Sequence, residues 1–148
     1  MTGSPGDEGS PLELLRALTG TWTTEGRHPL LPDALIRGRA TFEWLDGGRF
    51  LISRSHYDHP QIPDAVTVTG VVDDRLSMHY FDSRGVHRLY SVSAGSGEWR
   101  FWRDDPEFAQ RFTGTFGDDG DSFVTRGQFS RDGTTWEDDL ELTYRRAP

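Results

Sequence analysis

The chain has 148 residues, a length that suits one domain with a sizeable core or a barrel enclosing a cavity. Its formal net charge of −8 argues against nucleic acid and anionic membranes as partners, because both require a basic surface. Cysteine is absent, which excludes disulfides, thiolate nucleophiles and cysteine-based zinc sites.

The first nine residues differ in composition from the rest. Residues 1–9 carry Gly, Ser, Pro, Asp and Glu with almost nothing apolar, which predicts a disordered tail. Residues 10–148 then form the predicted single domain. The chain's 17 glycines and 8 prolines indicate many turns, and its aromatic side chains are numerous enough for a large core.

A short helix is predicted at the start of this domain. Ser10 suits the N-cap, Pro11 suits the first helical position, and Glu13 completes a capping box. Gly20 ends the helix. Its apolar stripe consists of Leu12, Leu15 and Leu18. A helix this short is not stable alone, so we expect it to dock on, and plug, one end of a barrel.

The first predicted strand, Gly20–His28, follows directly. Alternation places Trp22 and His28 on the same face of this strand. A Trp two residues after Gly20 suits closure of one barrel end, because the glycine lets the backbone turn in and the indole covers the core. The segment from His28 to Leu35 holds two prolines and three leucines, which predicts an irregular lid or packed loop.

Nine further strand-like segments follow, separated mostly by tight Gly- and Asp-containing turns. They are Arg37–Leu45, Arg49–Tyr57, Ala65–Val72, Leu76–Asp82, Val86–Ser93, Glu98–Arg103, Gln110–Phe116, Ser122–Ser130 and Trp136–Arg145. Short connections favour antiparallel neighbours in up-and-down order, and closure removes exposed strand edges. We therefore predict an all-β fold: a single antiparallel up-and-down β-barrel of about ten strands. A two-sheet sandwich is the alternative.

Several of these runs resemble known families. The runs Leu18–Trp22 and Gly26–Pro29 resemble the opening of calycin-type barrels, which include lipocalins, fatty-acid-binding proteins and nitrobindins. The runs Phe42–Gly48, His79–Gly85 and Ser130–Trp136 are similar to an uncharacterised bacterial family of lipocalin-like proteins. The resemblance implies a barrel with a lumen that holds a small apolar or aromatic molecule.

Ten strands behind a short helix most resemble the nitrobindins, whose barrels bind haem through a histidine near the C-terminus. The segment Asp138–Arg145 has no histidine, and the last histidine of the chain is His87. We therefore disfavour haem of the nitrobindin type. We expect no cofactor.

The run from His56 to His59 holds two histidines and Asp58. These groups could bind a metal if His28 or His79 came close. A polar loop at a strand end is the favoured interpretation, because this spacing has meaning mainly on a helix. We expect no metal site.

His79 is the candidate for acid–base chemistry. On its strand His79 and Phe81 share one face, and Tyr80 and Asp82 share the other. Facing a dry cavity, His79 could act as a general base or bind the polar end of a ligand. A hydrogen-bonded core histidine is an equally favoured interpretation.

Arg54 is the candidate for an anionic ligand group. It lies in phase with the apolar Phe50 and Ile52, where a charge needs either a carboxylate partner or an anionic ligand. A structural ion pair with Glu43 or Glu25 is the favoured alternative. The complete set of predicted ligand-binding residues is Trp44, Arg54, His56, His79, Trp102 and Arg111.

The leading functional hypothesis is binding of a small hydrophobic or aromatic ligand in the barrel, with Arg54 or His79 at its polar end. The first alternative is a cyclase- or isomerase-type enzyme with His79 as acid or base. The second is an empty barrel that serves as an interaction module. No long apolar run or secretory leader is visible, so we expect a cytoplasmic protein, with a homodimer left open.

Overall fold

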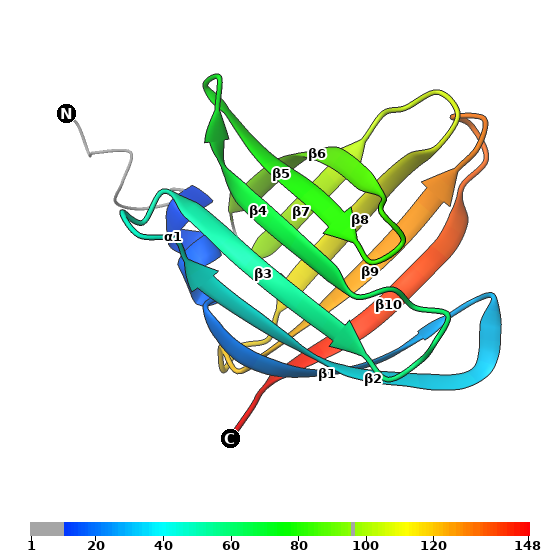
Figure 1. The fold of residues 1–148 in the computed structure, drawn as a ribbon, viewed down its shortest axis with the longest axis horizontal. Helices are drawn as coiled ribbons and strands as arrows, with labels where there is room; N and C mark the ends of the chain where they lie inside the picture. Colours follow the sequence, from blue (N-terminus) through cyan, green and yellow to red (C-terminus); the bar gives the residue numbers. More distant parts are fainter. Residues whose placement is uncertain (1–10, 96) are drawn as a thin grey trace.

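The computed structural model describes residues 11–95 and 97–148, which form one short helix and ten strands (Figure 1). The bounds are α1 Pro11–Ala17, β1 Gly20–His28, β2 Leu31–Trp44, β3 Phe50–Tyr57, β4 Ala65–Val72, β5 Arg75–Asp82, β6 His87–Gly95, β7 Glu98–Arg103, β8 Ala109–Phe116, β9 Ser122–Ser130 and β10 Glu137–Arg146. The predicted tail over 1–9 and the predicted N-cap Ser10 lie outside the described residues. No helix in the described part of the chain has the length and hydropathy that crossing a membrane requires.

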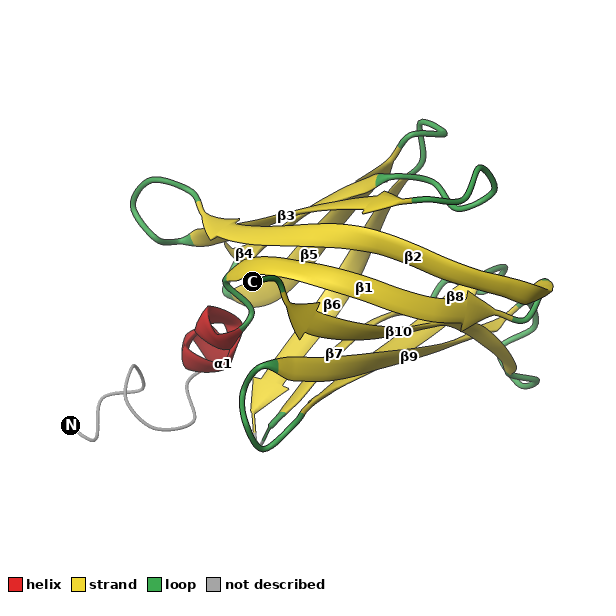
Figure 2. Ribbon diagram, turned by 90° about the horizontal axis from the view of Figure 1, so that it is seen from below, coloured by secondary structure: helices red, strands yellow, loops and turns green. Residues whose placement is uncertain are grey.

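The ten strands form one closed barrel (Figures 1 and 2). Each strand pairs antiparallel with the next along the chain, and β10 pairs back to β1. The predicted all-β, up-and-down barrel of ten strands is therefore confirmed, and the two-sheet sandwich is wrong. Because every strand has two partners, closure leaves no strand edge unpaired.

The connection between β1 and β2 differs from the prediction. The irregular loop expected from His28 to Leu35 is wrong, because β2 begins at Leu31 and the turn is only two residues long. The ladder shifts register between Gly26 and His28, so residues 32–35 of β2 bulge opposite a single residue of β1. Pro32 lies in this bulge, where its missing N–H removes no ladder bond.

Helix α1 lies across one end of the barrel, which we call the closed end (Figure 2). Leu15 and Leu18 of this helical segment are fully buried in the same apolar cluster as Trp22. The indole of Trp22 donates its N–H to the carbonyl oxygen of Leu18, 2.8 Å away, and meets the ring of Phe123 edge-on at 4.8 Å. The helix therefore covers the floor of the barrel, and Trp22 ties it to β1.

Arg146, at the end of β10, holds this closed end together. Its guanidinium donates hydrogen bonds to the carbonyl oxygens of Ala17 and Thr19, at 3.1 and 2.8 Å, and lies 4.2 Å from the Trp22 ring. The Ala17 carbonyl ends α1, where carbonyl groups lack partners within the helix, and the Thr19 carbonyl directly precedes β1. Gly20 has φ +123°, and a Cβ there would lie 2.8 Å from the Arg146 Nη1 atom. Only glycine suits this position.

Replacing Arg146 with Gln should lower the free energy of unfolding by about 2 kcal/mol, because it removes a cation–π contact and two charge-assisted hydrogen bonds. The neighbouring Arg145→Gln is the matched control, since Arg145 is exposed and takes no part in this contact. Urea unfolding followed by tryptophan fluorescence measures both. Equal stabilities for the two variants would show that Arg146 does not secure the closed end.

Candidate ligand site in the barrel lumen

The interior of the barrel contains a cavity of about 470 Å³, which we call the lumen. Its lining includes at least one residue from each of the five loops at the end opposite α1, which we call the mouth. One from each loop is Leu30, Ile62, Arg84, Phe108 and Arg131. Because α1 and Trp22 block the other end, the mouth is the side from which a molecule would enter.

All four tyrosines of the chain line the lumen. They are Tyr57, Tyr80, Tyr90 and Tyr144. Burial raises the pKa of each of these phenols, so all four hydroxyls stay protonated at neutral pH. Phe101 and Phe112 stack in the same wall, with ring centroids 4.8 Å apart. The lumen therefore combines apolar ring faces with a few hydroxyl groups.

A chain of hydrogen bonds crosses one wall of the lumen. The Tyr90 hydroxyl donates to Gln110 Oε1 at 2.6 Å, and Gln110 Nε2 donates to Asp139 Oδ2 at 3.1 Å. His28 Nε2 lies 3.3 Å from the other oxygen of Asp139. Because a carboxylate only accepts, the Gln110 amide must present its NH₂ group to Asp139 and its oxygen to Tyr90.

The hydrogen bonds of His28 determine which of its ring nitrogens carries the proton. Its Nδ1 atom accepts the backbone N–H of Leu30 at 3.0 Å, so the ring proton belongs on Nε2, which faces Asp139. Both ring nitrogens are therefore engaged with the protein. His28 positions Asp139 and the β1–β2 turn, and has no free lone pair with which to accept a proton from a bound molecule.

Asp82 has a buried carboxylate beside the mouth. Its oxygens accept hydrogen bonds from the Tyr80 hydroxyl at 2.8 Å, from Arg84 Nη2 at 2.7 Å and from the Arg84 backbone N–H at 2.9 Å. Burial by itself would raise the pKa of Asp82, but the bonds from Arg84 and Tyr80 outweigh burial and hold it at about 2. Asp82 therefore neutralises Arg84 and fixes the Tyr80 ring.

Two buried polar atoms have no hydrogen-bond partner among the described residues. They are the hydroxyl oxygen of Thr24 and the indole nitrogen of Trp99. Trp99 lines the lumen and its side chain is almost fully buried. An unpaired donor at such a position costs about 1–3 kcal/mol, and an acceptor supplied from inside the lumen would remove that cost.

Most of the residues predicted to bind a ligand lie outside the lumen. Tyr57, Tyr80 and Met78 line it, so alternation along β3 and β5 places Arg54, His56 and His79 on the outer face. Arg54 forms an ion pair with Glu43 at 2.9 Å, which is the structural alternative predicted for it.

His56 and His79 also have protein partners on that outer face. His56 lies between Asp58 and Asp64, at 3.3 and 3.0 Å, and the hydrogen bond that its ring donates to the Asp64 carboxylate raises its pKa. The His79 ring stacks on His87, with Nδ1 of one 3.3 Å from Nε2 of the other. Within the described residues, no three His, Asp or Glu side chains are grouped closely enough to hold a metal ion.

The three remaining candidates lie in two places. Trp44 is partly buried and packs against the core cluster, but does not line the lumen. Trp102 and Arg111 line a second hollow of about 1560 Å³ on the outside of β7 to β10. Arg111 lies 3.9 Å from the ring of Trp136 and donates to Gln128 at 2.8 Å.

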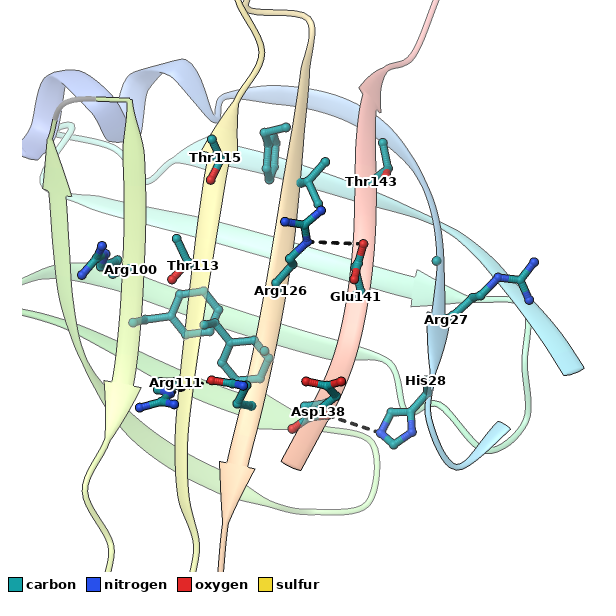
Figure 3. A pocket seen from close by; sticks show the side chains of 18 of the residues that line it. Arg27, His28, Arg100, Arg111, Thr113, Thr115, Arg126, Asp138, Glu141 and Thr143 are labelled. Atoms are coloured by element: carbon teal, nitrogen blue, oxygen red, sulfur yellow. Dashed lines mark hydrogen bonds and ion pairs between the residues drawn. The ribbon is translucent and has the colours of Figure 1, made fainter. Parts of the chain in front are cut away.

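Figure 3 shows this outer hollow, with Arg100, Arg111 and Arg126 on three neighbouring strands. Arg100 pairs with Glu98 at 3.1 Å, and Arg126 pairs with Glu141 at 3.5 Å. This hollow is the larger space, but it lies on the outer surface of the sheet, and two of these three arginines are neutralised by glutamates. The lumen is the better candidate site, because it lies inside the barrel between aromatic walls and holds a buried indole N–H, that of Trp99, without a partner in the described residues.

Comparison with known proteins informs the fold alone. No protein-family model matches the chain, and no curated protein sequence matches it. Among solved structures, the chain is similar to "Crystal Structure of Rv2717c from M. tuberculosis", with a TM-score of 0.66 and 15% sequence identity. The match covers 96% of this chain and 100% of that one. At this identity the likeness shows a shared barrel architecture.

Replacing Asp82 with Asn should lower the free energy of unfolding by about 2 kcal/mol at neutral pH, because the ionised group is more stable in the folded protein. Since the folded pKa lies below the unfolded one, this contribution is complete above about pH 4 and is lost as the pH falls towards about 2. Denaturant titrations at pH 7 and pH 3 measure it. Asp118→Asn, in an exposed turn, is the control, and a loss independent of pH would contradict this account of Asp82.

Proposed function

We propose that this protein binds a small apolar or aromatic molecule inside its barrel. The observation that carries the proposal is the lumen of about 470 Å³ inside the closed barrel, lined by aromatic rings and reached from one end. Binding cavities for small molecules span roughly 300–1,000 Å³ and combine apolar walls with a few polar groups. The tyrosine hydroxyls and the Trp99 indole N–H supply such polar groups in this lumen.

We further propose that the barrel is of the calycin type. A short helix over the closed end, the Gly20–Trp22 start of β1 and ten up-and-down strands support this assignment. The likeness to Rv2717c is compatible with it at the level of fold. Under this proposal the lumen is the ligand compartment, and the outer hollow over β7 to β10 is not.

An enzymatic role is less well supported. His79 lies on the outer face against His87, away from the lumen that would hold a substrate. His28 is the histidine that lines the lumen, and both of its nitrogens are engaged. For the same reason the lumen does not fit a haem ligated by histidine. Binding without chemistry therefore accounts for the described groups more simply.

The proposal predicts that the neutral dye N-phenyl-1-naphthylamine binds the protein and fluoresces more strongly. Filling the lumen with Ala65→Trp should weaken that binding by at least about tenfold, because the new indole occupies the dye's space. The matched control is Val66→Trp, one residue along β4, where the side chain points outward and is exposed.

Far-UV circular dichroism checks that both variants keep the barrel. If Ala65→Trp does not fold, Ser55→Phe fills the lumen from β3 instead, since Ser55 also lines it. Equal dye affinity for the lumen-filled protein and the control would show that the dye binds outside the barrel, and the proposed function would then be wrong.

A further inference from the structure

We propose that the ligand of the lumen is an acid, and that its carboxylate binds between Arg88 and Arg131 at the mouth while its apolar body enters the barrel. This inference rests on the proposed function and adds the chemical class of the ligand. It is carried by two guanidinium groups that line the lumen without a carboxylate partner in the described part of the chain.

Three arginines surround the ring of Phe108 at the mouth. The Cζ atom of Arg88 lies 5.0 Å from the ring centroid, and those of Arg103 and Arg131 lie 6.0 Å from it. Arg131 also approaches the ring of Phe129, at 5.6 Å. These aromatic faces hold the guanidinium groups at the entrance, where cation–π attraction limits their freedom.

Not all of the mouth arginines need a ligand. Arg103 forms an ion pair with Asp105 at 3.5 Å and donates to the Phe108 carbonyl oxygen at 3.1 Å. Arg84 is neutralised by Asp82. Arg88 and Arg131 differ, because neither forms an ion pair with any residue that the structure describes.

The carboxylate among the lumen-lining residues, Asp139, does not supply the missing partner. Its oxygens already accept from Gln110, from the backbone N–H of Leu140 and from His28. Acidic residues outnumber basic ones by 24 to 16 in the chain, yet none pairs with Arg88 or Arg131 in the described structure. Arg88 and Arg131 are therefore two cations without an acidic partner in the described structure, in a protein with an excess of negative charge.

Two unpaired cations around one ring repel each other, and an anion between them offsets that repulsion. A guanidinium presents parallel N–H donors whose geometry matches a carboxylate. Arg88 lines the lumen, and its Cζ atom lies 5.9 Å from the ring centroid of Tyr80, which also lines it. A ligand carboxylate at Arg88 would thus lie where the apolar walls begin.

The test uses two fluorescent probes that share the same apolar pyrene group, 1-pyrenebutyric acid and 1-pyrenebutanol. The first ends in a carboxylate and the second in a neutral hydroxyl. We expect the native protein to bind the acid about tenfold more tightly than the alcohol. Arg88→Gln and Arg131→Gln should each weaken binding of the acid by about tenfold and leave binding of the alcohol within about twofold. Added salt should weaken binding of the acid and leave binding of the alcohol unchanged.

Arg75→Gln is the matched control, because Arg75 is an exposed arginine at the opposite end of the barrel and should change neither affinity. Equal affinities of the native protein for acid and alcohol would overturn the carboxylate site and leave the proposed function standing. Equal weakening of both probes by the arginine variants would also overturn it, since the arginines would then act as apolar walls. Failure of both probes to bind would overturn the proposed function as well.

Discussion

The contact of Arg146 with Trp22 and the end of α1 is the constraint on which the rest of the structure depends. It joins the last strand to the first strand and to the helix, so barrel closure and the covering of one end occur together. With that end closed by Trp22, Leu15 and Leu18, the apolar floor is complete. The space that side chains leave unfilled then lies towards the mouth, which is why the barrel has one entrance.

Much of the fold could be predicted because its signals are local. Tight turns appear in the sequence as Gly- and Asp-containing runs, and the turn at Asp73 and Asp74 has both residues at positive φ, as its short connection requires. Alternation then identifies the strands. The β1–β2 connection was mispredicted because Pro32 normally breaks a strand, whereas here a long-range register shift accommodates it in a bulge.

The site could not be predicted as well, because the sequence does not show which face of a strand points inward. On β3 the face with Phe50 and Ile52 is the more apolar, yet Ser53 and Tyr57 line the lumen. A barrel with a cavity needs small and hydroxyl-bearing side chains inside, and half-exposed apolar residues cover its outside. Trp22 and Tyr144 are buried and lie on the inner face of their strands. Carrying this inward alternation from strand to paired strand around the barrel would have selected the other tyrosines and Arg88 as inward-facing residues.

The most direct measurement is a crystal structure of the protein soaked with N-phenyl-1-naphthylamine. This account predicts electron density for the dye inside the barrel, against Tyr90 and Tyr144, with α1 and Trp22 still covering the closed end. Density confined to the outer hollow over β7 to β10, or an interior filled by the protein's own side chains, would contradict the claim that the lumen is a binding compartment.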